Sequence, residues 1–213
     1  TWSQRAAGGP AHPQPAMAYD VAGDHTVLHI GSPVTGATWT ATTGAWTQAM
    51  PIAPAQVGSA VYDARRGVTV VVIHANPVEV WEWDGAAWTY LPVAVAPSVR
   101  SEPQVAFDAA RGEVVLFGGE FGGGVLGDTW TWDGTAWDQR APAATPPARK
   151  GGAMGYDPLR DRVVLFGGNG AGQVRRDDTW EWDGTTWIER SPGLAPAPRD
   201  GVNVTFDNGR GAL

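Results

Sequence analysis

Histidines are the residues of this sequence whose chemistry most readily suggests acid–base catalysis or metal binding. There are four of them, His12, His25, His29 and His74. Only His25 and His29 are closely spaced, and in a strand they would share a face about 13 Å apart. That separation is too large for one metal ion. The chain has no cysteine, which excludes a thiolate metal site and a cysteine nucleophile. We therefore expect neither a metal nor a cofactor.

Pairs of aspartate and arginine recur in the motif Tyr/Phe-Asp-x-x-Arg. Its four occurrences are Asp63 with Arg66, Asp108 with Arg111, Asp157 with Arg160, and Asp207 with Arg210. A catalytic carboxylate is needed once, whereas an ion pair that caps a tight turn recurs in every structural repeat. We interpret these pairs as structural. No Gly-x-Ser-x-Gly motif is present, and the glycine-rich segments 118–127 and 167–173 precede no predicted helix. We therefore expect no enzyme activity.

The composition limits the fold and the partners. The chain has 213 residues, 43% of them hydrophobic, with 29 Gly and 17 Pro, which favours a globular protein with almost no helix. A net charge of −7 without a basic cluster argues against nucleic acid as a partner. No apolar segment is long enough for a membrane-spanning helix. The abundance of Ala, Gly, Pro and Arg indicates a bacterial source, and we expect a secreted or cell-surface protein.

Two landmarks repeat along the chain with steps of 42 to 50 residues. The first is an aspartate that ends a short apolar stretch, and the second is the first tryptophan of an aromatic cluster. The aspartates are Asp20, Asp63, Asp108, Asp157 and Asp207, and the tryptophans are Trp39, Trp81, Trp130 and Trp180. Because two independent landmarks keep the same step, the chain is predicted to consist of structural repeats.

Each repeat contains four strand-like segments, which are clearest at 152–157, 162–168, 178–184 and 185–190. The second is continuously apolar, as expected for a strand covered on both faces. The third alternates, and its Asp-Gly predicts a tight hairpin. A four-residue connection would then place Trp182 opposite Trp187.

Four antiparallel strands at this period, with no helix between them, predict the blade of a β-propeller. The glycine doublets Gly118-Gly119 and Gly167-Gly168, each followed by an aromatic pair and a lone tryptophan, resemble the kelch family of propellers. In the first two repeats, which have Ile30-Gly31 and Ile73-His74 at the doublet, the similarity lies mainly in the spacing. The resemblance implies that the first strand of each blade is innermost and the fourth outermost.

The predicted fold is all-β, a single kelch-like propeller domain over 1–213 with four complete blades and an incomplete fifth. The complete blades are expected at about 14–48, 58–91, 104–140 and 151–190. Residues 1–5 match a fourth strand and 201–213 the start of a blade. Because open sheet edges invite pairing with other chains, we expect either a fragment of a longer ring or a partner strand or chain that completes the open blade.

Candidate ligand contacts lie in the connections between strands. The resemblance implies that one mouth of the channel is formed by the proline-rich connections between blades, where arginines contact acidic ligands in kelch domains. Loops 119–127 and 169–177 would lie at the same mouth, and Phe121 has no blade to pack into. The candidates are Arg100, Arg149 and Arg199 in the connections, Glu120 and Phe121 in the first loop, and Asn169, Arg175 and Arg176 in the second. For the three arginines, a solvated side chain without a ligand is the alternative.

The expected function is that of a non-catalytic module that binds a protein or a carbohydrate through these loops. Stacking of the tryptophans on sugar rings is an alternative to packing between blades, but their periodic positions favour packing. Two other functions stay open. One is the propeller domain of an enzyme whose catalytic residues lie outside this chain, and the other is a purely structural repeat of a surface assembly.

Overall fold

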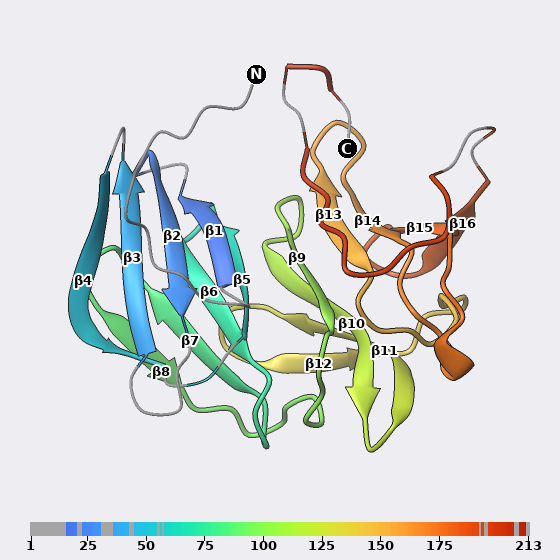
Figure 1. The fold of residues 1–213 in the computed structure, drawn as a ribbon, viewed down its shortest axis with the longest axis horizontal. Coiled ribbons are helices and arrows are strands. Elements are labelled where there is room, and N and C mark those ends of the chain that lie inside the picture. Colours follow the sequence, from blue (N-terminus) through green and yellow to red (C-terminus); the bar gives the residue numbers. More distant parts are fainter. Residues whose placement is uncertain are drawn as a thin grey trace. The chain divides into compact units, whose positions relative to one another are not determined.

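The structure is a computed structural model of the chain. It describes residues 16–20, 23–30, 36–42, 45–54, 56, 58–191, 193, 196–206 and 209–211. The chain divides into two compact units, Thr1–Ala96 and Pro97–Leu213. Each unit contains two sheets of four antiparallel strands that follow one another in sequence order (Figure 1). The fold is all-β and belongs to the β-propeller class, as the repeat predicts.

The first unit contains eight strands in two sheets. The strands of the first sheet are β1 (Ala16–Asp20), β2 (His25–Ile30), β3 (Gly36–Thr42) and β4 (Ala45–Ala53). Those of the second sheet are β5 (Gly58–Asp63), β6 (Val68–Ile73), β7 (Glu79–Trp83) and β8 (Trp88–Leu91). The first sheet extends to Ala53, past residue 48 where the first blade was expected to end.

The second unit repeats this arrangement. Its first sheet consists of β9 (Gln104–Asp108), β10 (Glu113–Phe121), β11 (Gly124–Trp132) and β12 (Trp137–Arg140). Its second sheet consists of β13 (Ala153–Asp157), β14 (Arg162–Phe166), β15 (Thr179–Trp182) and β16 (Trp187–Arg190). Helix is limited, within the described ranges, to the 3-10 turn η1 (Ala171–Gln173) between β14 and β15.

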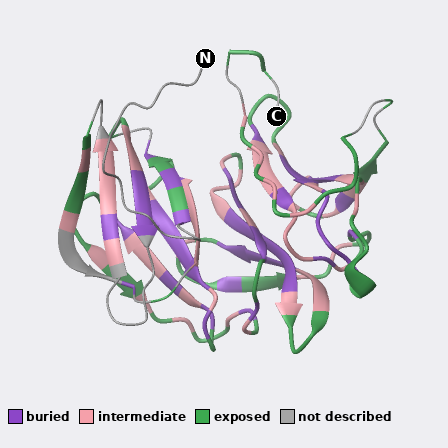
Figure 2. Ribbon diagram, in the orientation of Figure 1, coloured by how far each residue is buried: buried purple, intermediate pink, exposed green. Residues whose placement is uncertain are grey.

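The second strand is deeply buried in the β5–β8 and β9–β12 sheets, because it is apolar on both faces. In β6, Val70 to Ile73 are fully buried, and in β10 the same holds for Val115, Leu116 and Phe117. Both strands are coloured purple over most of their length in Figure 2. The continuous apolar runs of the sequence therefore form the interior strands, as predicted.

Tryptophan pairs join the third and fourth strands in three of the four sheets. Trp182 lies directly opposite Trp187 in the register of β15 and β16, and their ring centroids are 5.5 Å apart. Trp132 with Trp137 and Trp83 with Trp88 repeat this pair at 5.6 and 5.5 Å. In the connecting turn Gly184 has φ +96°, a conformation that favours glycine. The predicted hairpin and its aromatic pair are confirmed.

The lone tryptophan of the fourth strand also joins neighbouring sheets. In the second unit, the Trp187 ring meets Phe117 of β10 edge to face at 5.4 Å, and its Nε1 donates a hydrogen bond to Thr129 Oγ1 at 2.9 Å. In the first unit, Trp88 packs on His29 at 5.4 Å and donates to Thr38 Oγ1 at 2.7 Å. The periodic tryptophans therefore hold adjacent sheets together.

The two expected partial blades have different outcomes. Residues 1–5 lie outside the described part of the chain. Residues 201–206 are described but form no strand, although an inner strand was predicted there. A strand requires hydrogen-bonded neighbours, and within this range none is paired in a ladder.

Replacing Trp187 with Phe is expected to reduce the free energy of unfolding more than replacing Trp182 with Phe. Both changes remove a similar volume from the core. Trp187→Phe also leaves Thr129 Oγ1 without its indole donor, whereas Trp182 Nε1 has no hydrogen-bond partner among the described residues. The extra loss should be about 1 kcal/mol, measured by urea denaturation. Equal losses in the two variants would contradict the assigned hydrogen bond.

Candidate binding loops

The repeated Asp–Arg pairs cap the hairpins that join the first and second strands. Arg66 Nε lies 2.6 Å from Asp63 Oδ2, and Arg160 Nε lies 2.7 Å from Asp157 Oδ2. Arg111 pairs with Asp108 in the same way at 2.8 Å. The other oxygen of each carboxylate accepts backbone N–H groups of the turn. The structural interpretation is confirmed for these three pairs, while Asp207 of the fourth lies outside the described residues.

Arg100 and Arg149 occupy a different place from the one predicted for them. Both are buried, at 2% and 0% exposure, and each binds an aspartate with two guanidinium nitrogens. Arg149 binds Asp178 with two contacts of 2.6 Å, and Arg100 binds Asp128 at 2.7 and 2.9 Å. Neither arginine is a solvated side chain, and neither is placed to contact a ligand, because its charge is already paired with an aspartate inside the sheet.

The same aspartates also hold the first tryptophan of the third strand. Trp180 Nε1 donates to Asp178 Oδ2 at 2.8 Å, and Trp130 Nε1 donates to Asp128 Oδ2 at 2.7 Å. Each set of three residues is called here an Arg–Asp–Trp cluster. Its arginine also donates to the carbonyl of the first doublet glycine, Gly118 or Gly167, at 3.0 Å. The cluster therefore ties the first, second and third strands of one sheet together.

The electrostatics of the clusters favour ionised aspartates. Burial alone would raise the pKa of Asp178, but hydrogen bonds from Arg149 and Trp180 and the charge of Arg149 hold that pKa below its ordinary value. The pKa of Asp128 is lowered in the same way, with Arg100 and Trp130 outweighing burial. Both ion pairs are consequently present over the whole neutral range.

The glycine doublets let the backbone of the next repeat approach closely. Gly119 N donates to Arg149 O at 2.9 Å, and a Cβ on Gly118 would lie 2.4 Å from that oxygen. Gly118 and Gly119 have φ of +63° and +106°, which glycine adopts without strain. Arg149 is thus attached by its backbone to the β9–β12 sheet and by its side chain to Asp178 of its own sheet.

Arg199 has the backbone contacts of this series without the ion pair. Gly168 N donates to Arg199 O at 2.8 Å, and Arg199 N donates to Arg176 O at 3.0 Å. The Arg199 side chain is exposed, and its Nε donates to Ala197 O at 2.8 Å. No carboxylate of the described residues forms a salt bridge with it. Of the three predicted arginines, Arg199 alone presents its guanidinium to the surface.

The segment 119–127 was predicted to be a loop, but most of it is strand, because β10 extends to Phe121 and β11 begins at Gly124. The hairpin between these strands holds Phe121 out of the core. Phe121 is 56% exposed and is followed by Gly122 and Gly123 at the tip of the hairpin. At its base, Glu120 forms an ion pair with Lys150, and the backbones of Glu120 and Ser101 form a β-bridge. The pairing with Glu120 raises the pKa of Lys150. Phe121 is exposed, as predicted.

The connection between β14 and β15 has a polar base as well. Asn169 is buried and donates from Nδ2 to Asp200 Oδ2 at 2.9 Å. Arg175 reaches the other oxygen of Asp200 at 2.7 Å, although 64% of its side chain is exposed. Arg176 is half-buried. Val174, which sequence reasoning missed, is 61% exposed in this loop.

Polar residues at the bases of the β10–β11 and β14–β15 connections link these two connections to each other. Lys150 pairs with Glu120 of the first loop through its side chain and with Asn169 of the second through a backbone bridge. Lys150, Asp200 and Gln173 belong to this network, but the sequence did not single them out. Lys150 was detectable as the single lysine of the chain.

Two further kinds of site are absent from the described part of the chain. It contains no group of three His, Asp or Glu side chains arranged to hold a metal ion. His29 is buried, which lowers its pKa, and it packs against Trp88. None of the helical structure in the described ranges has the length and apolar character of a membrane span.

These features define the chain as a β-propeller protein with structured connections between the second and third strands of its sheets, and a comparison with solved structures agrees on the fold. A solved structure described as that of YjhT superposes with a TM-score of 0.67, covering 92% of this chain and 74% of that chain at 14% sequence identity. At this identity the likeness is one of fold. No family model and no curated protein sequence matches the chain.

Replacing Arg149 with Ala is expected to destabilise the second unit by about 3 kcal/mol, because the carboxylate of Asp178 would stay largely buried without its partner. The matched control is Arg175→Ala, which removes an exposed ion pair worth less than about 1 kcal/mol. Chemical denaturation followed by circular dichroism measures both. A loss for Arg149→Ala no larger than that of the control would contradict the role of the cluster.

The contribution of Asp178 to stability should depend on pH in the acid range. Because its pKa is lower in the folded than in the unfolded chain, the unfolded chain binds more protons between the two values. Stability therefore rises with pH across that window, and it is lost as the pH is lowered. The stabilisation of the wild type over Asp178→Asn is expected to be complete above the unfolded pKa, near 3.8, and to shrink as the pH falls through the folded value. A constant or growing difference would argue against the assigned pairing.

Proposed function

We propose that the chain is a non-catalytic, kelch-like propeller module that binds a protein partner through the loops 119–127 and 169–177. The observation that carries the proposal is the exposed Phe121 at the tip of one loop above a base held by ion pairs. Exposed aromatic side chains that are surrounded by polar groups are typical anchors of protein interfaces.

The two loops are equivalent connections in adjacent sheets, since each joins a second strand to a third. Both carry an exposed apolar residue, Phe121 in one and Val174 in the other. Their tips are green in Figure 2. The network of Glu120, Lys150 and Asn169 holds the bases of the loops, which reduces the entropy lost when a partner binds. Two exposed apolar residues above a polar base that is already ordered support a protein as the ligand.

A protein fits this surface better than a carbohydrate does. Sugar rings stack on flat aromatic faces, and the second unit's tryptophans from 130 to 187 are all buried to 9% exposure or less. Phe121 is the exposed aromatic residue in the described part of this unit. The absence of catalysis is also part of the proposal, because the aspartates of the hairpins and of the Arg–Asp–Trp clusters are already paired with arginines.

A phage-displayed random peptide library panned on the immobilised chain tests this function. Selected peptides are expected to bind the wild type and to lose at least about tenfold in affinity, roughly 1.4 kcal/mol, on Phe121→Ala. Tyr90→Ala is the control, because Tyr90 is also an exposed aromatic residue, 44% exposed in β8, and should leave binding unchanged. The proposal fails if selected peptides bind Phe121→Ala as well as the wild type, or if a glycan array yields ligands whose binding does not involve Phe121.

A further inference from the structure

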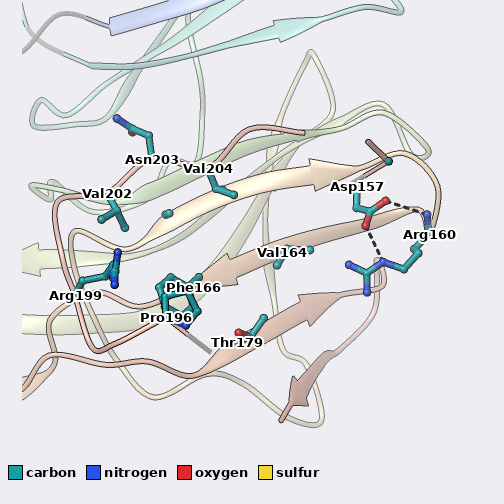
Figure 3. Close-up of a pocket in the computed structure, with 12 residues that line it drawn as sticks. Asp157, Arg160, Val164, Phe166, Thr179, Pro196, Arg199, Val202, Asn203 and Val204 are labelled. Carbon is teal, nitrogen blue, oxygen red and sulfur yellow. Dashed lines mark hydrogen bonds and ion pairs between the residues drawn. The ribbon is translucent and has the colours of Figure 1, made fainter. Parts of the chain in front are cut away.

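One face of the β13–β16 sheet carries a pocket with a volume of about 590 Å³ (Figure 3). Its floor includes Val164 and Phe166 of β14 and Thr179 of β15. One wall is formed by residues of the following segment, namely Pro196, Arg199, Val202, Asn203, Val204 and Gly211. Arg199 and Val202 line it from that wall. The pocket thus lies between a sheet face and the segment that was expected to begin another blade.

The neighbouring sheet shows what covers the same face there. The residues of β9–β12 that correspond to Val164, Phe166 and Thr179 in the repeat are Val115, Phe117 and Thr129. Val115 and Phe117 are fully buried in one cluster with the apolar residues of the following sheet. Phe117 receives the Trp187 ring and Thr129 its indole N–H. A following sheet with a fourth-strand tryptophan therefore covers this face.

The first unit provides a second, independent example. There, the ring of His29 and the hydroxyl of Thr38 take the places of Phe117 and Thr129, and Trp88 of the next sheet contacts both. In both units, an aromatic ring and a threonine of one sheet form the receptor for a tryptophan of the next. Phe166 and Thr179 are the third such pair, and both are half-buried.

Arg199 adds a charge requirement to this apolar receptor. Arg100 and Arg149 are each bound by an aspartate that precedes a tryptophan by two residues, 28 and 29 residues further along the chain. Arg199 has the same backbone attachment as Arg149, as described above, but its guanidinium is exposed at the edge of the pocket. An occupant that repeats the internal contacts must therefore bring a carboxylate as well as an indole.

We propose that this pocket is the docking site for one further blade-type segment, whose third strand carries Asp-x-Trp and whose fourth strand carries a tryptophan. The aspartate binds Arg199 with both oxygens. The fourth-strand tryptophan donates its indole N–H to Thr179 Oγ1 and rests its ring on Phe166. Residues 202–206 then pair as the first strand of the completed sheet.

A second copy of this chain does not meet these requirements. The outer sheet of its first unit has Ala37-Thr38-Trp39 where Asp-x-Trp is needed, so it offers Arg199 no carboxylate. Asp128 and Asp178, which do precede a tryptophan in this way, are already bound by Arg100 and Arg149. Glu79 also precedes a tryptophan by two residues, but the fourth-strand tryptophan of its sheet, Trp88, is already held by His29 and Thr38.

The test is a fusion in which the whole chain is followed directly by a second copy of residues 164–190. The copy of Asp178 then lies 29 residues after Arg199, the separation seen between Arg149 and Asp178. We expect Arg199→Ala to lower the Tm of the fusion by about 5 °C or more and that of the natural chain by less than about 1 °C. Replacing the appended aspartate with Ala should produce the same loss, and the two changes together should not add.

Hydrogen exchange provides a second measurement that does not depend on Tm. Backbone amides of residues 202–205 should exchange at least about tenfold more slowly in the fusion, because they enter a ladder. The proposal is overturned if Arg199→Ala shifts the Tm of both chains equally, or if the slowing survives loss of the appended aspartate. It is also overturned if the natural chain sediments as a dimer that Arg199→Ala dissociates, since the occupant would then be a second copy.

Discussion

The contact of a fourth-strand tryptophan with the preceding sheet is the interaction on which each unit depends. A single four-stranded repeat cannot bury its apolar faces alone. Trp187 covers the apolar face of the preceding sheet, because its ring packs against Phe117 and its indole N–H donates a hydrogen bond to Thr129. Trp88 does the same with His29 and Thr38. The repeated indole is therefore explained by the need of the first sheet of each unit to be covered by the second.

The Arg–Asp–Trp clusters and the glycine doublets make this packing directional. A cluster arginine such as Arg149 is attached by its backbone to the doublet of the preceding sheet and by its side chain to Asp178 of its own. Within the second unit, the β13–β16 sheet therefore docks on the β9–β12 sheet in one direction. The same attachment orders the bases of the loops on either side of Lys150, while Phe121 stays exposed at a tip.

The fold could be predicted from the sequence because its determinants are local. Trp182, Asp183, Gly184 and Trp187 lie within six residues and specify a hairpin by turn chemistry alone. The burial of Arg100 and Arg149 could not be predicted in this way, since their aspartates lie 28 and 29 residues away. A signal was nevertheless present. At these two positions, arginine and aspartate occur together in the third and fourth repeats. Neither occurs in the first two repeats, where the corresponding residues are His12 with Ala37 and Ala55 with Glu79.

Native-state hydrogen exchange in the second unit tests most directly whether the tryptophan contact makes adjacent sheets one cooperative structure. The account predicts that the slowest amides of β10 and β14 exchange with the same opening free energy. It also predicts that Trp187→Phe lowers both values equally. Different opening free energies for the two strands, or a loss confined to β14 in the variant, would show that the sheets are stable separately and would contradict the account.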